Sequence, residues 1–326
     1  MGDDSVRLRT SIVVPAYNEA GSVAALLRSI VGQELRAAEL CEIVVVASGC
    51  TDGTHAQVEE VAQADSRIRL LVQPDRIGKV AAINAYLLER DPTADIVVIC
   101  SADIHLQAGC LEHLVEPFAA DPRLGMTGGR PVPTNRPGTL LGDMVHLLWQ
   151  LHHDRAVESP KLGEIVAVRS ALMRPLPDRS AVDEASAEAA VRARGYELRY
   201  IARAEVSNRG PDNMGEYFDQ RRRINAGHYW LRRSSGYEPS TFAWRRVLRL
   251  ALRRVSWRRP RQTLALVVAA AVELAARSAG RVDLRRGRSH SIWKVSPSAR
   301  PQLDAANTAS SPAPHLPATI DPPTGR

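Results

Sequence analysis

The stretch that most constrains the fold is an apolar run, Ile96 to Cys100, which ends in the polar loop Ser101-Ala102-Asp103. An uninterrupted apolar run of this length predicts a buried strand. Asp103 would then lie at the carboxyl end of that strand, where ligands bind in open α/β sheets. We predict that Asp103 holds a metal or a ligand. The alternative is that it only caps the next helix.

Three strand-loop-helix units precede this run. Strands are expected at residues 11–15, 42–46 and 68–72, and the helices that follow them at 23–31, 55–64 and 80–88. Successive βα units imply a mostly parallel, doubly wound sheet, so the fold class is α/β. No GxGxxG or GxxxxGK[ST] motif follows any of these strands, so a nucleotide would have to be held in another way.

The second half of the chain contributes further helices and one strand. Helices are expected at 140–155, from about 183 to 194, and at 214–230, with an edge-like strand at 163–168. The acids Asp183 and Glu184 begin the second of these helices, where in the simplest interpretation they only favour the helix dipole. Arg221, Arg222 and Arg223 are consecutive on the third helix, so at least one faces the protein unless that helix is fully exposed. They predict polyanion binding, with a solvated basic face as the alternative.

The chain divides into an acidic body and a basic C-terminal part. Residues 1–240 carry 27 Lys+Arg against 32 Asp+Glu, and residues 241–326 carry 16 against 4, so the net charge of +7 hides a split of −5 and +12. A basic segment on an acidic body indicates one localised contact with an anionic partner. Charge alone does not distinguish a membrane from a nucleic acid as that partner. The four cysteines lack metal-type spacing and are expected to be reduced, and residues 1–10 show no secretory signal.

Residues 241–262 contain eight arginines, no acid and an apolar set at helical spacing. This pattern predicts a helix lying in a membrane interface. After Pro260, residues 264–276 are 13 residues that are apolar except for Glu273, too few to span about 30 Å of hydrocarbon, so a second surface-lying helix is expected. Alternatively, this second helix packs on the domain formed by residues 1–240. Residues 296–326 are expected to be a disordered tail. The apolar set comprises Trp244, Val247, Leu248, Ala251, Leu252 and Val255.

The order of these motifs resembles that of the family 2 glycosyltransferases, inverting enzymes with the GT-A fold, over roughly residues 9–235. The matching segments are 13–19, 48–54, Gly78-Lys79 with Asn84, 101–103, 183–184 and 220–224. Three positions depart from the family pattern. Ala47-Ser48 replaces an acid pair that often reads uracil, so a uridine donor is not implied. Ser101 replaces the first acid of the metal motif, and Ile224 replaces a Trp found in processive enzymes.

The resemblance implies a catalytic domain at residues 1–240 that uses a nucleotide-sugar donor with Mg²⁺ or Mn²⁺. Asp103 would hold the metal, and Glu184 would be the base that takes a proton from an acceptor hydroxyl, with Asp183 as the second candidate. The implied donor-binding residues are Pro15, Tyr17, Glu19, Ser48, Asp52, Lys79, Ala102, Asp103, Gln220, Arg222 and Arg223.

The acceptor is not identified by sequence, and a lipid-linked or cell-envelope glycan precursor is one candidate. We expect a cytoplasmic protein, peripheral at the inner face of the cell membrane, whose residues 241–295 contact an anionic membrane surface rather than nucleic acid. Two other functions are weighed. A nucleotidyltransferase would normally carry a Gly-rich loop with a basic residue after the first strand, which residues 15–19 lack. The other alternative is an inactive glycosyltransferase-like binding protein.

Overall fold

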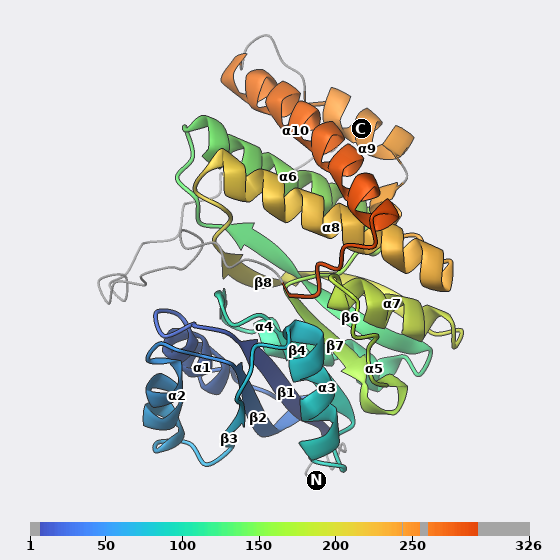
Figure 1. The fold of residues 1–326 in the computed structure, drawn as a ribbon. Helices are drawn as coiled ribbons and strands as arrows, with labels where there is room; N and C mark the ends of the chain where they lie inside the picture. The colour runs from blue at the N-terminus through green and yellow to red at the C-terminus, as the bar shows by residue number, and fades with distance from the viewer. Residues whose placement is uncertain (1–6, 243, 255–259, 293–326) are drawn as a thin grey trace, which may run out of the picture.

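The computed structural model describes residues 7–242, 244–254 and 260–292. Its centre is one eight-stranded sheet in the order β3-β2-β1-β4-β7-β6-β8-β5 (Figure 1). The strands are β1 Leu8–Ala16, β2 Ala38–Ser48, β3 Ile68–Gln73, β4 Ile96–Cys100, β5 Ile104–Leu106, β6 Leu124–Pro133, β7 Ile165–Arg169 and β8 Glu197–Asn208. The fold class is α/β, as the sequence predicted.

The N-terminal half of the sheet is parallel, and the second half is mixed. β3, β2, β1 and β4 run parallel to one another, whereas β7 is antiparallel to both of its neighbours, β4 and β6. β6 and β8 are parallel again, and β5 is antiparallel to β8. The prediction of an edge-like strand at 163–168 is therefore wrong. β7 lies in the interior of the sheet, which explains why Ile165 to Val168 are all fully buried.

Helices cover both faces of the sheet because alternate strand residues point to opposite sides. Ile12 and Val14 of β1 face the core shared with α1, α2 and α4, whereas Val13 faces the core shared with α3 and α7. The helices are α1 Val23–Val31, α2 Thr54–Ala62, α3 Lys79–Glu89, α4 Cys110–Val115, α5 Pro117–Ala120, α6 Leu140–Glu158, α7 Asp183–Arg192, α8 Met214–Ser235, α9 Trp244–Leu252 and α10 Pro260–Arg285, with 3₁₀ turns at Ser170–Leu172 and Ser240–Phe242. All four cysteines are free thiols.

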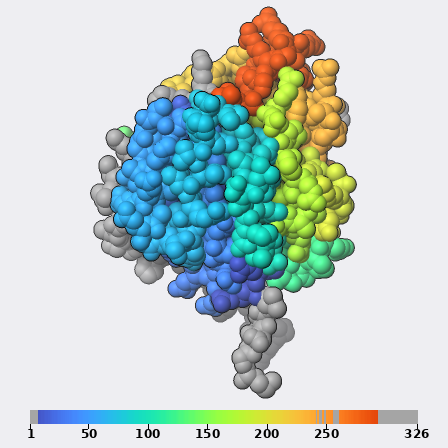
Figure 2. All heavy atoms as spheres, turned by 60° about the horizontal axis from the view of Figure 1, so that its bottom comes forward, coloured from blue at the N-terminus to red at the C-terminus, as the bar shows by residue number. Residues whose placement is uncertain are grey.

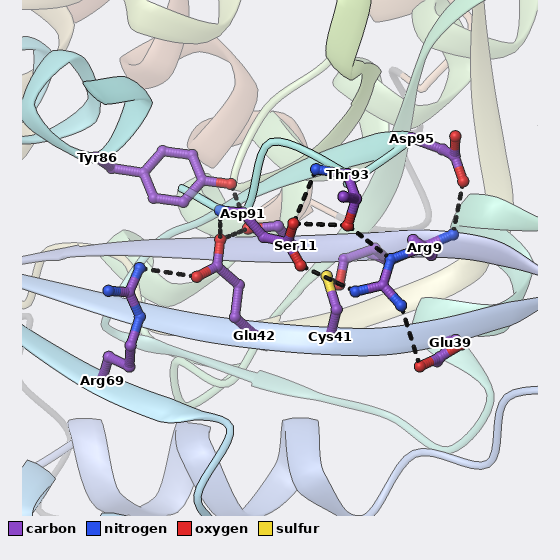
Figure 3. A network of polar contacts seen from close by, with 11 residues as sticks. Arg9, Ser11, Glu39, Cys41, Glu42, Arg69, Tyr86, Asp91, Thr93 and Asp95 are labelled. Atoms are coloured by element: carbon purple, nitrogen blue, oxygen red, sulfur yellow. Dashed lines mark hydrogen bonds and ion pairs between the residues drawn. The ribbon is translucent and has the colours of Figure 1, made fainter. Parts of the chain in front are cut away.

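A polar network holds the amino-terminal ends of β1 and β2 together, at the end of the sheet away from the cavity described below (Figure 3). Glu42 is 6% exposed and accepts hydrogen bonds from the Ser11 hydroxyl at 2.6 Å and the Asp91 amide at 2.7 Å. Its second oxygen accepts from Arg69 at 2.8 Å. A buried carboxylate with three donors is well satisfied, so this network stabilises the sheet.

The C-terminal helices form a separate layer above the carboxyl ends of the strands. α10 packs on α8 and α6 around a small core that includes Met144, Tyr217 and Ala265, and Figure 1 shows it crossing both helices. Figure 2 shows this layer, in orange and red, beside the blue and cyan N-terminal units. Pro260 is the first residue of α10, a position that proline suits because its missing N–H has no helical partner there.

α10 is longer than the 13 residues counted in the sequence. At 26 residues it is the one helix in the described part of the chain that is long and apolar enough to cross a membrane. The expectation of a short second helix was wrong because the count stopped at residue 276, before the polar residues Arg277 and Ser278, whereas the helix continues through them to Arg285. Its two acids, Glu273 and Asp283, face the protein, where arginines of α8 neutralise them. The predicted tail at 296–326 and the apolar residue Val255 lie outside the described residues.

Candidate active site

A cavity of about 1360 Å³ lies between the carboxyl ends of β1, β2 and β4 and the helical layer of α6, α8, α9 and α10. Its floor is made by the loops that follow these strands, and its side wall by the first turns of α3 and α7. This is where ligands bind in an open α/β sheet. The sequence-based placement of Asp103 at a strand end therefore leads to this cavity.

The first two loops are joined by hydrogen bonds between segments far apart in sequence. The Thr51 amide donates to Asn18 Oδ1 at 2.7 Å, and the Glu19 amide donates to Thr54 Oγ1 at 2.7 Å. The Asn18 backbone has a φ of +55°, a conformation that asparagine tolerates better than most residues. These bonds fix the loop that places Tyr17 on the cavity wall, where the Arg76 guanidinium stacks on its ring at 3.9 Å.

Lys79, the first residue of α3, connects the two acids at the start of α7. Its Nζ lies 2.9 Å from Asp183 Oδ2 and 2.9 Å from Glu184 Oε1. Burial lowers the pKa of Lys79, but attraction to the two carboxylates outweighs it, and the net shift is upward. Burial likewise raises the pKa of Glu184, and the Lys79 ammonium reverses this and holds it below its usual value.

Asp183 behaves differently from its neighbour although both contact Lys79. Burial and the adjacent Glu184 charge raise the pKa of Asp183. The Glu184 side chain is also the more open of the two, at 18% exposure against 5% for Asp183. Of the two acids, Glu184 therefore has the lower pKa and the better access from the cavity.

Asp103 faces a second carboxylate that the sequence analysis did not single out. Cys100 of β4 pairs with Ile165 of β7, so the residue before β7, Glu164, lies across the ladder from Ser101, and the Ser101 amide donates to the Glu164 carbonyl at 3.0 Å. Burial raises the pKa of both acids. The charge of Asp103 raises the pKa of Glu164 further. Glu164 has a φ of +62°, a costly conformation for a non-glycine residue.

Most of the predicted donor-binding residues meet at this cavity. Those that line it are Pro15, Tyr17, Glu19, Ser48, Lys79, Ala102, Asp103, Gln220, Arg222 and Arg223. Asp52 is the exception. Its carboxylate accepts from the Thr54 amide and hydroxyl at 3.0 and 2.5 Å and from the Ala20 amide at 3.1 Å, so it organises the start of α2 instead of facing the cavity.

The three arginines of α8 separate into different environments. Arg221 binds Glu273, and Arg222 binds Asp283 through two contacts of 2.6 and 2.7 Å, so both are tied to α10. Arg223 instead faces Asp183, Glu184 and Glu164, and burial lowers its pKa to about 10. Of these three arginines, Arg223 is thus the one on whose pKa the acids of the site act.

The other part of the cavity is apolar and lies under α9 and α10. Its wall includes Leu148 and Leu151 of α6, Val247 and Ala251 of α9, and Leu266 and Ala269 of α10. The cavity therefore joins a charged half at the strand ends to an apolar half in the helical layer. No sequence motif pointed to the apolar half, because it is assembled from three helices that are separated along the chain.

Comparison with known proteins identifies the family. Residues 11–169, which carry the first loops, Lys79 and Asp103, match the profile described as Glycosyl transferase family 2. Over these residues the chain belongs to the family 2 glycosyltransferases. Its α/β sheet with a cavity at the strand ends is the GT-A fold, as in the solved mannosyltransferase PcManGT from Pyrobaculum calidifontis, whose structure is a complex with GDP-Man and Mn²⁺. That match has a TM-score of 0.59 at 24% identity and covers 88% of this chain and 81% of the other.

Two curated relatives match this chain over shorter segments. The glycosyltransferase AglD of Haloferax volcanii is 31% identical over 129 residues, which are 39% of this chain and 20% of the relative. The dolichyl-phosphate beta-glucosyltransferase ALG5C of Trichomonas vaginalis is 37% identical over 99 residues, 29% of each protein. The chain thus aligns with less than a third of the length of either relative.

Proposed function

We propose that this enzyme transfers a sugar from a nucleotide-sugar donor to an acceptor hydroxyl with inversion at the anomeric carbon. The observation that carries the proposal is the contact of Lys79 with Glu184 at one end of the cavity that also contains Asp103. One displacement needs a base on the acceptor side and positive charge on the leaving-group side. Glu184 supplies the first, and Lys79 and Arg223 supply the second.

The carboxylates at one end of the cavity suit a divalent metal ion. Asp103 would hold it, with Glu164 as a second carboxylate close enough to feel its charge, and both offer the hard oxygen ligands that Mg²⁺ and Mn²⁺ prefer. Among the described residues no cluster of three or more metal-binding side chains occurs, so donor phosphates and water would complete the coordination. When bound, such an ion stabilises the charge that develops on the diphosphate leaving group. The Mn²⁺ in the mannosyltransferase complex supports this assignment.

Lys79 would couple donor binding to the strength of the base. Without a donor, its ammonium lowers the pKa of Glu184 and makes that carboxylate a weaker proton acceptor. A diphosphate that attracts the Lys79 ammonium would weaken this ion pair, so the pKa of Glu184 would rise toward the range in which general bases work best. The base would then be strongest when the donor is in place.

For the acceptor we propose a lipid-linked molecule. Hydrocarbon would suit the apolar half of the cavity, since burying it there removes apolar surface from water. The name of the dolichyl-phosphate relative supports the same class. Such an acceptor requires the enzyme to work at a membrane surface, as proposed from the basic C-terminal segment. The nucleotidyltransferase alternative is set aside by the family match.

The test begins with donor identification. Nucleotide sugars are screened with Mn²⁺ for a rise in melting temperature, because a ligand that binds only the native state must stabilise it. Glu184→Gln is then compared with wild type for transfer rate and for donor affinity. Loss of one general base should lower the rate by about 10² to 10⁴ while donor affinity stays within about twofold.

Asp183→Asn is the matched variant, because it neutralises the neighbouring acid on the same helix turn. If Glu184→Gln is fully active and Asp183→Asn is not, the base is Asp183. If both variants transfer sugar at the wild-type rate, neither acid is the base and the proposed mechanism is wrong.

A further inference from the structure

A small basic cavity lies between the C-terminal parts of α8 and α10, apart from the cavity at the strand ends. It has a volume of about 290 Å³ and is lined by Tyr229, Arg232, Arg233, Arg281, Leu284 and Arg285. None of these residues lines the large cavity that holds Asp103 and Glu184. Four guanidinium groups thus surround a site that the proposed transfer reaction does not use.

The two helices approach each other closely just before this basic cavity. A Cβ on Gly280 of α10 would stand 2.9 Å from the Ala226 backbone nitrogen of α8, so a larger residue there would push the helices apart. Tyr229, about one turn beyond Ala226, is 8% exposed, and the Arg281 guanidinium lies over its ring at 5.1 Å. The close contact therefore brings arginines of both helices to one place.

The arginines of the basic cavity outnumber their acidic partners. Arg232 pairs with Glu238 at 2.7 Å, but both side chains are more than half exposed, so this ion pair is weak. Arg233 and Arg285 are exposed and make no ion pair or hydrogen bond with other residues that the structure describes. A simpler role for such arginines is to complement the negative ends of two helix dipoles. That role requires no cavity between them, whereas binding of an anion does.

Arg281 and Arg285 also continue the outward face of α10. Leu274 and Arg281 are seven residues apart and Val267 and Arg285 eighteen, which correspond to about two and about five helical turns. Leu274 is 67% and Val267 60% exposed. The outward face is therefore apolar at these positions and basic at its C-terminal end. At a membrane surface, such a face places apolar side chains in hydrocarbon and guanidinium groups among the lipid phosphates.

We propose that the basic cavity binds the terminal phosphate of a membrane lipid, a phosphomonoester such as that of phosphatidic acid. A terminal phosphate offers three acceptor oxygens and up to about two negative charges, which suits several guanidinium groups better than a phosphodiester with one charge. The bound lipid fixes one orientation of the enzyme, with α10 against the membrane. This inference goes beyond the proposed function, because it depends on neither the sugar donor nor the acceptor.

The test uses dihexanoyl phosphatidic acid below its micelle-forming concentration, so that binding to the full chain is measured by calorimetry without a bilayer. Dihexanoyl phosphatidylcholine, which has the same acyl chains but no net charge, should bind at least about tenfold more weakly. Arg233→Ala with Arg285→Ala removes two exposed groups that donate charge-assisted hydrogen bonds. This variant should bind phosphatidic acid about tenfold or more weakly than wild type.

Arg246→Ala with Arg249→Ala is the matched control, since it removes two exposed arginines of α9 that do not line the basic cavity. Its affinity for the short-chain lipid should equal that of wild type. If wild type does not bind phosphatidic acid, or if Arg233→Ala with Arg285→Ala binds it equally well, the proposed site is wrong. Equal losses in the two double variants would show a diffuse effect of charge and would also overturn it.

Inorganic phosphate distinguishes the two sources of the anion. It lacks the acyl-glycerol part that would contact Leu284, so it should bind wild type at least about tenfold more weakly than the lipid does. If inorganic phosphate binds as tightly as dihexanoyl phosphatidic acid, the basic cavity takes free phosphate and the assignment to a lipid is overturned.

Discussion

At the scale of single residues, His152 on α6 links the cavity to the acid stability of the protein. Its Nδ1 is fully enclosed and has no hydrogen-bond partner among the described residues. Burial, followed by repulsion from Lys161 and Arg221, lowers the pKa of His152 to about 3. In the unfolded chain an imidazole has a pKa of about 6.5. The unfolded state therefore binds a proton between these values that the folded state does not bind.

We predict that this difference reduces the free energy of unfolding as pH falls below about 6.5, by up to about 1.4 kcal/mol per pH unit until the folded pKa is reached. His152→Gln removes the proton-binding group and should flatten the stability profile by that amount between pH 6.5 and 4.5. Urea unfolding at several pH values measures the slope. His105→Gln, at an exposed histidine, is the control and should leave the slope unchanged. Equal slopes for wild type and His152→Gln would contradict the assignment.

Single residues also show how far the sequence predicts the site. Asp103 was singled out because it follows a buried strand, which a local pattern reveals, whereas Lys79 and Glu184 were singled out because their segments resemble the family pattern. Glu164 was missed because its place beside Asp103 depends on the antiparallel pairing of β7 with β4. Asp52 was assigned to the donor because its loop resembles the family pattern, whereas its carboxylate satisfies local backbone donors. A single sequence shows neither which strands pair over long range nor whether a side chain binds a ligand or the neighbouring backbone.

At the scale of elements, the βα units were predicted best. α1 has the predicted bounds, and β1, β2 and α3 extend the predicted segments by a few residues. Apolar periodicity determines such elements locally. The predicted edge position of β7 was wrong because a short apolar strand has the same sequence pattern in the interior of a sheet as at its edge. The length of α10 was wrong because only the apolar run up to residue 276 was counted, and a helix can continue through polar residues such as Arg277 and Ser278.

The network around Glu42 provides a stability prediction for β2. Glu42→Ala leaves the Ser11 hydroxyl and the Asp91 amide without their acceptor in a buried place, and it should lower the free energy of unfolding by about 3 kcal/mol. Glu39→Ala on the same strand is the matched control. Glu39 is 51% exposed and faces Arg9 at 3.4 Å, so the loss should stay below about 0.5 kcal/mol. Chemical denaturation measures both, and equal losses would show that the network has no special role.

At the scale of the whole molecule, the basic residues near the C-terminus and the apolar residues between them lie on different surfaces of the helical layer. Arg246 and Arg249 of α9 and Arg253, which directly follows it, are exposed, while Val247 and Ala251 line the cavity. The predicted apolar stripe of α9 thus faces inward in part, although Leu252 is 60% exposed and the side chains of Trp244 and Leu248 lie outside the described structure. The basic face of α9 remains available to an anionic surface.

The exposed apolar surface is instead on α10. Leu264, Val267, Leu274 and Val282 are between 40% and 67% exposed and follow one another at roughly helical spacing. The opposite face carries Glu273 and Asp283, which bind arginines of α8. A transmembrane orientation would break these ion pairs, and unpaired charges are costly in hydrocarbon. A helix that keeps its charged face on the protein and its apolar face outward suits a position in the membrane interface.

We therefore predict that the enzyme binds anionic membranes through α10, assisted by the arginines of α9. Leu264→Asp with Val267→Asp removes apolar contact worth about 1.5 to 3 kcal/mol per inserted side chain and adds repelled charge, so the variant should lose flotation with anionic liposomes at low salt. Deleting everything after residue 240 would be a poorer test, because α10 also neutralises Arg221 and Arg222.

Leu88→Asp, at an 84% exposed leucine of α3, is the control and should float like wild type. Since the arginine contribution is screened by ions, flotation of the wild type should also weaken as salt is raised. If Leu264→Asp with Val267→Asp floats as well as Leu88→Asp, α10 is not the membrane contact, and a soluble acceptor becomes the better proposal.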